Sequence, residues 1–212
     1  MSRGSFLIAV GLALITAALC LVGHNLAEES AAERNADRVV TQMREILPEA
    51  SGTAEEDNRA ETPPSDPGPL YQSYPEVEMP AVEVEGELYI GILQIPALQL
   101  ELPVMREWSY PKLKTAPCRF TGSAYTDDLV LMAHNYERHF GRLKDLGMGD
   151  AVRFTDMDQN VFSYRVEAVE LLQAEDVENM TAGEWPLTLF TCTVGGAYRV
   201  TVRCERIANE WD

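Results

Sequence analysis

Basic residues are scarce in this chain. Its 212 residues include 17 lysines and arginines against 34 aspartates and glutamates, so the formal net charge is −17. Proteins that bind nucleic acids need a basic surface, and this composition excludes that class. Apolar residues make up 46% of the chain, which is enough to build a hydrophobic core.

The acidic excess is concentrated in one segment. Residues 28–87 contain 16 acidic residues and 4 arginines, whereas the rest of the chain is only mildly acidic. Runs of charge are usually solvated, so we interpret this segment as a tether and take no binding site from it. The length of the chain allows one domain of ordinary size with appendages.

Only one long apolar run is present. Residues 6–22 (FLIAVGLALITAALCLV) contain no charge, and their number lies at the short end of the range for a membrane span. Arg3 precedes the run and Glu28 and Glu29 follow it, so the positive-inside rule places the N-terminus in the cytoplasm and the rest of the chain outside. No small-x-small site follows, which favours an uncleaved anchor over residues 1–27 rather than a cleaved signal peptide.

Cysteines are few, and their number argues against a domain stapled by disulfides. Of the four, Cys20 lies inside the apolar run, where we expect it to pack as a small hydrophobe. Cys118, Cys192 and Cys204 remain, an odd number, so at least one is predicted to be free or intermolecular. Cys204 reads as a core residue, with pairing to Cys118 as the less favoured alternative. A lone thiol in an exported protein is a candidate nucleophile.

Two segments separate the anchor from the folded part. Residues 28–50 are predicted to form a helical stalk that stops near Pro48. Residues 51–85 are acidic and contain six prolines, a composition typical of a semi-rigid linker that cannot order itself by burying apolar surface. The folded domain is expected to cover residues 86–212.

Short β runs dominate this domain. Apolar or alternating patterns predict strands over residues 89–95, 98–102, 129–133, 151–155, 161–166, 187–191 and 199–203, with 151–166 forming a hairpin. Helical character is confined to residues 139–146 and 174–180. Many short strands with few helices predict an all-β domain that is closed or sandwiched.

Two of these strands end in residues that can do chemistry. Cys192 follows the strand 187–191, and a thiol that attacks a carbonyl needs a base or a cation nearby. Among the three histidines, His24 lies at the membrane boundary and His139 lies in a polar segment, where we expect it to be solvated. His134 follows the strand 129–133, so it is the candidate base. A single cysteine or histidine at a strand end is more often structural, and this pair alone does not decide the matter.

A resemblance to a known family supports the pair. Residues 187–203 (LTLFTCTVGGAYRVTVR) resemble the sortase signature, in which a TLxTC stretch and a turn precede an arginine that opens the last strand. Residues 130–135 (VLMAHN) resemble the family's strand that ends in the catalytic histidine, and residues 89–96 (YIGILQIP) resemble the strand that opens its barrel. The resemblance runs from about residue 86 to residue 207.

The resemblance implies an eight-stranded barrel and a cysteine transpeptidase. Cys192 would be the nucleophile, His134 the proton-transfer partner and Arg199 the oxyanion stabiliser. The partners implied are sorting-signal peptides of surface proteins and an amine from a cell-wall precursor or a pilin lysine. We expect no cofactor, because the acidic residues show no spaced ligand set such as an EF-hand loop.

Three other positions have two readings each. Arg203 lies four residues after Arg199 on the same face of a strand, so it is the alternative oxyanion residue, although a surface or salt-bridging role is favoured. Thr191 either shapes the peptide groove or is an ordinary satisfied strand residue. Asn135 either orients the histidine or is an ordinary turn residue.

Rival functions and the subclass remain open. B-type sortases have a long helix before the strand of the nucleophile, and the segment between Val169 and Leu187 is too short for it. A Cys–His cell-wall peptidase without transpeptidase activity is one rival, although papain-like enzymes place the cysteine before the histidine. A catalytically silent sortase-like surface module is the other.

Overall fold

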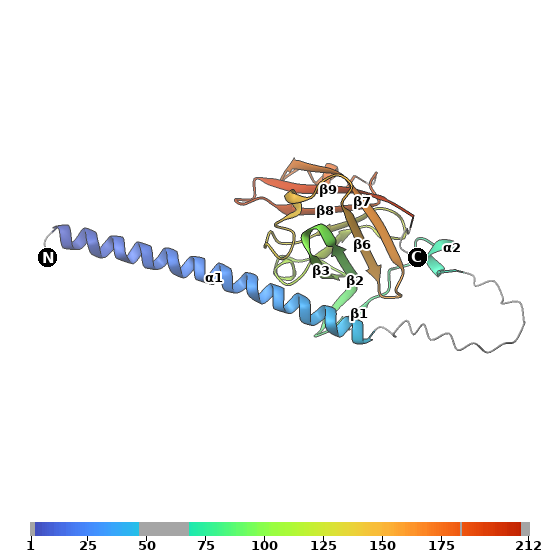
Figure 1. Cartoon of the computed structure of the whole chain (residues 1–212), viewed down its shortest axis with the longest axis horizontal. Helices are drawn as coiled ribbons and strands as arrows, with labels where there is room; N and C mark the ends of the chain where they lie inside the picture. The colour runs from blue at the N-terminus through green and yellow to red at the C-terminus, as the bar shows by residue number, and fades with distance from the viewer. Residues whose placement is uncertain (1–2, 47–67, 183, 209–212) are drawn as a thin grey trace, which may run out of the picture.

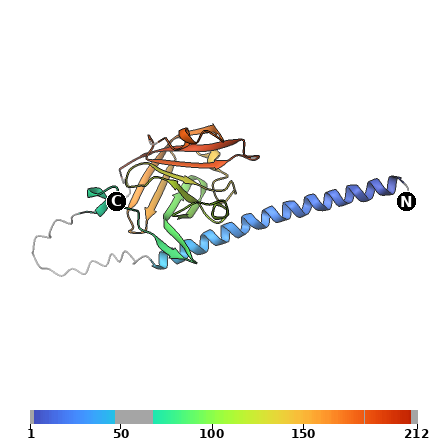
Figure 2. The same ribbon diagram turned by 180° about the vertical axis from the view of Figure 1, so that it is seen from behind.

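The structure is a computed structural model that describes residues 3–46, 68–182 and 184–208. A long helix lies beside a β barrel, and its N-terminal half extends away from the barrel (Figures 1 and 2). Residues 47–67, which include the predicted helix end near Pro48 and about half of the predicted linker, lie outside the described residues.

Eight strands close into the barrel. In spatial order these are β2 (Glu87–Ile95), β3 (Leu100–Met105), β4 (Cys118–Thr121), β5 (Leu129–Met132), β8 (Leu187–Cys192), β9 (Tyr198–Arg206), β7 (Val161–Gln173) and β6 (Ala151–Asp156), and β6 pairs back to β2. The β3–β4 and β5–β8 pairs are parallel and the others are antiparallel. The predicted eight-stranded closed barrel is therefore confirmed. A ninth strand, β1 (Val82–Val84), pairs with the start of β2.

The barrel interior is filled by alternate residues of the strands. On β8, Leu187 and Leu189 point into the main core, and on β9 Val200, Val202 and Cys204 do the same. This is the period-2 pattern that the sequence predicts for half-buried strands. Gly91 is needed where β2 meets β6, because a Cβ there would lie 2.3 Å from the carbonyl oxygen of Thr155.

The predicted hairpin is present as β6 and β7, with β7 longer than expected. The short strands β1 and β4 were not predicted, because three or four residues give too little alternation to be recognised. The helices within residues 68–182 and 184–208 have only three or four residues each: α2 (Leu70–Ser73), η1 (Pro96–Leu98), α3 (Tyr110–Leu113), η2 (Leu143–Asp145) and α4 (Val177–Met180).

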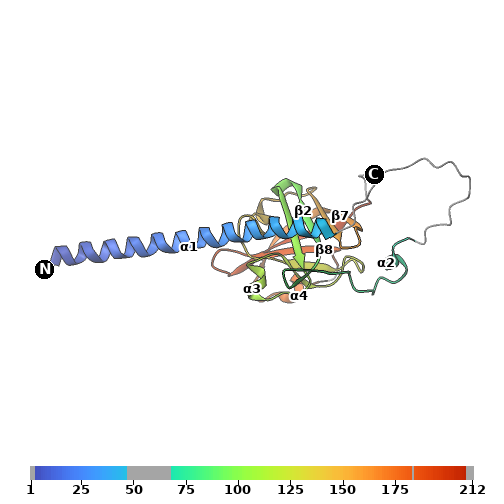
Figure 3. The same ribbon diagram turned by 90° about the horizontal axis from the view of Figure 1, so that it is seen from below.

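Helix α1 (Arg3–Ile46) unites the predicted anchor and the predicted stalk in one continuous helix. Its N-terminal part is apolar and long enough to cross a membrane, and it is not buried in the protein. Its C-terminal part lies along the outside of the barrel (Figure 3). The buried residues of this part recur at helical spacing: Ala32, Ala36, Val39, Val40 and Met43. We predicted a stalk, and this segment instead packs as part of the folded body.

The packed region also begins before residue 86, where we expected the domain to start. Tyr71 on α2 stacks on Tyr125 with ring centroids 4.6 Å apart, and β1 covers the start of β2. The side chains of α1 and β1 form a second core with the outer faces of β2, β3 and β4, in which Val39, Met43 and Tyr89 are buried. The apolar side chains before residue 86 are scattered among acids and prolines in the sequence, so no local pattern predicts their burial. They pack because the surface of the barrel lies beside them.

The packing of α1 can be tested at Met43, which is completely buried against the barrel. Met43→Ala should lower the free energy of unfolding by about 2–4 kcal/mol, because it removes a thioether side chain and leaves a cavity. Urea unfolding of the full chain in detergent micelles measures this loss. Glu45→Ala, an exposed position on the same helix, is the control and should change stability by less than about 0.5 kcal/mol. Equal stability of the two variants would contradict a packed helix.

Candidate active site

The site forms where the parallel strands β5 and β8 end. Their register pairs Leu129 with Leu187 and Met132 with Phe190, an offset of 58 residues. The same offset relates Thr191 to Ala133, and the Thr191 hydroxyl donates a hydrogen bond of 2.9 Å to the Ala133 carbonyl. Applied to the next residue, the offset of 58 relates His134 to Cys192, so these two residues lie level with each other. Because the carboxyl ends of parallel strands meet at one edge, both residues emerge there.

Because side chains alternate along a strand, Thr191 and Cys192 point to opposite faces of β8. Thr191 is buried, whereas Cys192 is exposed on the outer face of the barrel. Cys192 pairs directly with Arg199 at the start of β9, and Val200 points into the core, so Arg199 also lies on the outer face. His134, Cys192 and Arg199 therefore come from three adjacent strands and form a row at one end of the barrel.

A cavity of about 700 Å³ covers this row. His134, Asn135, Thr191, Cys192 and Arg199 all line it, so the structure brings together every site residue that the sequence predicts. The Thr191 hydroxyl is already satisfied by the backbone, which is the ordinary strand role considered above.

The environments of the cysteines separate one thiol from the rest. The four cysteines are free, and the pairing of Cys118 with Cys204 that we considered is not formed. These two lie in different hydrophobic clusters, and burial raises the pKa of each thiol to about 12. Both therefore stay protonated and inaccessible. Cys192 is the exposed thiol of the barrel.

His134 lies in a partly desolvated position. Burial lowers the pKa of His134 below its ordinary value, and the Asn135 side chain opposes this shift. The Tyr136 ring stacks on the imidazole with centroids 4.2 Å apart and planes 12° apart. Gly141 keeps this loop tight, because a Cβ there would lie 2.5 Å from the Asn135 carbonyl oxygen.

The two arginines of β9 have different environments. Arg199 is partly buried and donates hydrogen bonds to the carbonyls of Gly196 (2.9 Å), in the turn before β9, and Tyr198 (3.2 Å), the first residue of β9. Arg203 is almost fully buried, forms an ion pair of 3.2 Å with Glu170, and donates to the Met180 carbonyl at the end of α4. Of the two alternatives predicted for Arg203, a surface or a salt-bridging role, the structure shows the salt bridge, in a buried position.

His139 is also not where the sequence places it. We expected it to be solvated, and the structure buries it completely in the loop behind Tyr136. Burial lowers its pKa to about 4. The neighbours Glu137 and Arg138 are exposed, so this segment looks polar in the sequence and predicts a solvated histidine.

The apolar wall of the cavity was not predicted. It consists of side chains from several segments, among them Trp108, Phe120, Met132, Val177, Met180 and Phe190. Trp108 contacts Phe120, whose ring meets that of Phe190 edge to face at 5.4 Å. These residues are far apart in the sequence, and only the closed barrel brings them together. In the part of the chain that the structure describes, no cluster of His, Cys, Asp or Glu is placed to hold a metal ion.

The burial of His139 predicts a pH-dependent stability. The folded pKa of about 4 lies below the ordinary 6.5, so the unfolded chain takes up a proton first as the pH falls. The stability that neutral His139 contributes is complete above pH 6.5 and is lost between pH 6.5 and 4, by up to about 3 kcal/mol. Urea unfolding of the full chain across this range should show the loss, and His139→Phe should remove it. Equal pH slopes for both proteins would contradict the assignment.

The comparisons with known proteins agree with the observed fold. A model of the sortase domain matches residues 93–207. No curated protein sequence matches the chain. The fold is similar to that of sortase A from Corynebacterium diphtheriae, a lid mutant, with a TM-score of 0.51 and 21% identity over 58% of this chain and 72% of that chain.

Two other solved structures are similar to about the same degree. Sortase C1 from Streptococcus agalactiae matches with a TM-score of 0.51 and 23% identity over 60% of this chain and 72% of that chain. The sortase D5 transpeptidase from Clostridium perfringens matches with a TM-score of 0.50 and 17% identity over 57% of this chain and 79% of that chain. At these identities the neighbours show the fold, and the family model covers more than half of the chain. The chain belongs to the sortase family.

Proposed function

We propose that this sortase is a membrane-anchored cysteine transpeptidase in which Cys192 is the nucleophile, His134 the general acid and base, and Arg199 the oxyanion stabiliser. The observation that supports this most directly is the row of these three side chains at one cavity. Its substrates are sorting-signal peptides of surface proteins, and the acceptor is an amine of a cell-wall precursor or a pilin.

The first half-reaction forms a thioester. The Cys192 thiolate attacks a peptide carbonyl, which becomes a tetrahedral oxyanion. The C–N bond then breaks, and protonated His134 gives its proton to the leaving amine. The acyl part of the sorting signal stays on Cys192, and neutral His134 is left beside it.

The second half-reaction returns the enzyme to its starting state. The incoming amine attacks the thioester while neutral His134 takes its proton, and a new amide replaces the C–S bond. Cys192 leaves as thiolate beside protonated His134. Because burial lowers the pKa of His134, the neutral form that this step needs is accessible at neutral pH.

Arg199 serves both tetrahedral oxyanions. Its guanidinium donates to the Gly196 carbonyl in the glycine-rich turn, and Arg199 is directly paired with Cys192. Arginine suits this role because it is permanently charged and offers several N–H donors in a fixed plane. A donor that is already positioned needs little reorganisation when the negative charge develops.

The cavity wall favours an extended peptide with apolar side chains. One side of the cavity is lined by Phe120, Met132 and Phe190, and the reactive row lies at its polar end. A peptide lying along the wall would bring one backbone carbonyl to Cys192. The short segment before β8 contains α4, and no long helix occurs in its described residues 174–182 and 184–186, which favours a subclass other than the B type.

The apolar segment of α1 supports a reaction outside the cell. Helix α1 has one apolar segment near its N-terminus, with acidic residues after it, which favours a single-pass topology with the N-terminus in the cytoplasm.

Hydrolysis by a Cys–His peptidase differs from transpeptidation only in using water as the acceptor, so product analysis has to separate the two.

A peptide library tests the proposal. The full chain in detergent micelles is incubated with fluorogenic sorting-signal peptides and an amine acceptor, and the products are analysed by mass spectrometry. The wild type should cleave at least one motif and transfer the acyl part to the amine. Cys192→Ala should lose at least about a thousandfold in rate. Cleavage that survives in Cys192→Ala refutes the mechanism, release of free acid alone indicates a peptidase, and no cleavage of any motif favours a silent module.

The two arginines of β9 can be separated by the same substitution. Arg199→Lys should lower kcat/KM about 100-fold with little change in thermal stability, because lysine cannot reproduce the planar fork. Arg203→Lys should instead lower the free energy of unfolding by about 2 kcal/mol, because it breaks buried hydrogen bonds of a charged group. Kinetics and urea unfolding of both variants measure this. The opposite pattern would assign the oxyanion role to Arg203.

A further inference from the structure

The N-terminal helix makes its contacts with the barrel in two different ways. Along Val39 to Met43 the contact is mainly apolar and belongs to the second core, with the ion pair between Arg38 and Glu85 beside it. Nearer to the membrane segment it is made by acidic side chains. Glu28 and Glu29 are partly buried, although they lie on a helix whose preceding residues are exposed.

These acidic side chains bind the loop that follows β5. Tyr136 donates its hydroxyl to the Glu28 carboxylate at 3.3 Å. The Glu137 backbone N–H donates to the Glu29 carboxylate, and Arg138 forms an ion pair of 2.8 Å with Glu33. Three consecutive residues of the loop are therefore held by one face of α1.

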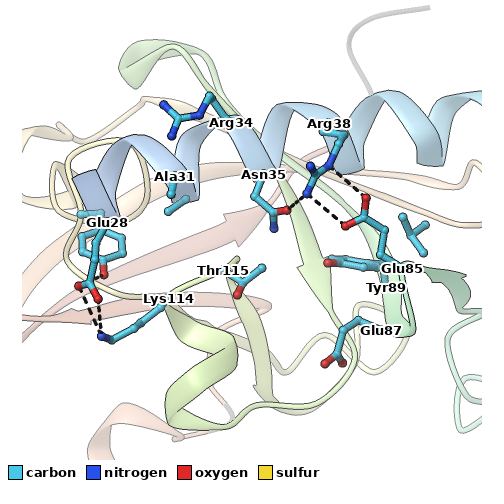
Figure 4. Close-up of a pocket in the computed structure, with 13 residues that line it drawn as sticks. Glu28, Ala31, Arg34, Asn35, Arg38, Glu85, Glu87, Tyr89, Lys114 and Thr115 are labelled. Carbon is cyan, nitrogen blue, oxygen red and sulfur yellow. Dashed lines mark hydrogen bonds and ion pairs between the residues drawn. The ribbon is translucent and has the colours of Figure 1, made fainter. Parts of the chain in front are cut away.

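A second connection links Glu28 to His134 through Lys114. The Glu28 carboxylate also accepts from Lys114, at 3.2 Å (Figure 4). Lys114 directly follows Leu113, and the His134 backbone N–H donates to the Leu113 carbonyl at 3.4 Å. His134 thus has two supports, the stacked Tyr136 ring and the Leu113 carbonyl, and both supports lead to Glu28.

We propose that Glu28 is a positioning residue for the active site, which fixes the loop of His134 through Tyr136 and Lys114. This inference rests on the function proposed above. It makes the membrane anchor part of the catalytic apparatus, because the helix that contains the apolar segment also holds the histidine in place.

The charge of Glu28 acts on His134 as well. The groups that face the imidazole are Glu28 from α1, Lys114 from the end of α3, Tyr136 and His139 from its own loop, and Cys192 and Arg199 from β8 and β9. Among them the Glu28 carboxylate raises the pKa of His134, and Lys114 lowers it. Removing the carboxylate leaves Lys114 unpaired, so both changes disfavour the imidazolium.

The test uses the full chain in detergent micelles with labelled histidine side chains, so that the ring of His134 is titrated by NMR without any substrate. Glu28→Gln should lower the titration midpoint of His134 by about half a pH unit. It should also lower kcat/KM about tenfold, mainly in kcat, because a displaced general acid is misaligned in the transition state.

Matched variants separate positioning from simple docking of the helix. Tyr136→Phe keeps the ring stack and loses the hydroxyl, so it should reduce kcat, and Glu28→Gln with Tyr136→Phe should be no worse than the stronger single variant. Glu28→Asp keeps the charge and should keep the titration midpoint. Arg38→Gln breaks an ion pair of 3.1 Å between α1 and Glu85, away from the His134 loop. This variant should leave the His134 titration midpoint unchanged and should change kcat by less than twofold.

The outcomes are distinct. An unchanged His134 midpoint and unchanged kcat in Glu28→Gln would overturn the inference, and so would equal losses in Glu28→Gln and Arg38→Gln. If no peptide is cleaved even by the wild type, the proposed function fails, and the NMR arm still decides whether Glu28 controls His134.

Discussion

The parallel pairing of β5 with β8 is the constraint on which the site depends. Parallel strands end at the same edge, so the register that pairs Leu129 with Leu187 also brings His134 level with Cys192. Barrel closure fixes this register, because a slip of one residue would exchange the core and outer faces of the strand. The proposed nucleophile and its base are therefore aligned by the same hydrogen bonds that hold the core together.

The faces of β8 and β9 divide structural from chemical roles. Inward side chains such as Leu189 and Val202 fill the core, and outward ones at the strand ends face the cavity. The same division explains the thiols, since Cys204 is buried and inert while Cys192 is exposed. Arg199 and Arg203 share the outer face of β9, and their positions along the strand separate them: Arg199 lies beside the cavity, whereas Arg203 anchors α4, which forms part of the cavity wall.

The continuous helix α1 links the apolar N-terminal segment to the barrel. Its acidic contacts lie nearest to the apolar segment, and they meet the barrel at the edge that bears His134. With a rise of about 1.5 Å per residue, Glu28 lies only about 9 Å beyond the end of the apolar run at Val22. The residues of α1 that contact the loop of His134 are therefore those closest to the apolar segment.

The sequence by itself determined the strands with clear alternation, the barrel family and the Cys–His–Arg set, because these depend on local patterns and on motifs a few residues long. It could not determine that residues 28–46 pack on the barrel, that His139 is buried, or which side chains form the apolar wall. A polar segment such as 134–140 reads as solvated until its neighbours are known, and the acidic residues of α1 read as a tether until Lys114, Tyr136 and Arg138 are placed beside them. Only barrel closure decides these contacts, because it brings together residues that are up to about a hundred positions apart in the chain.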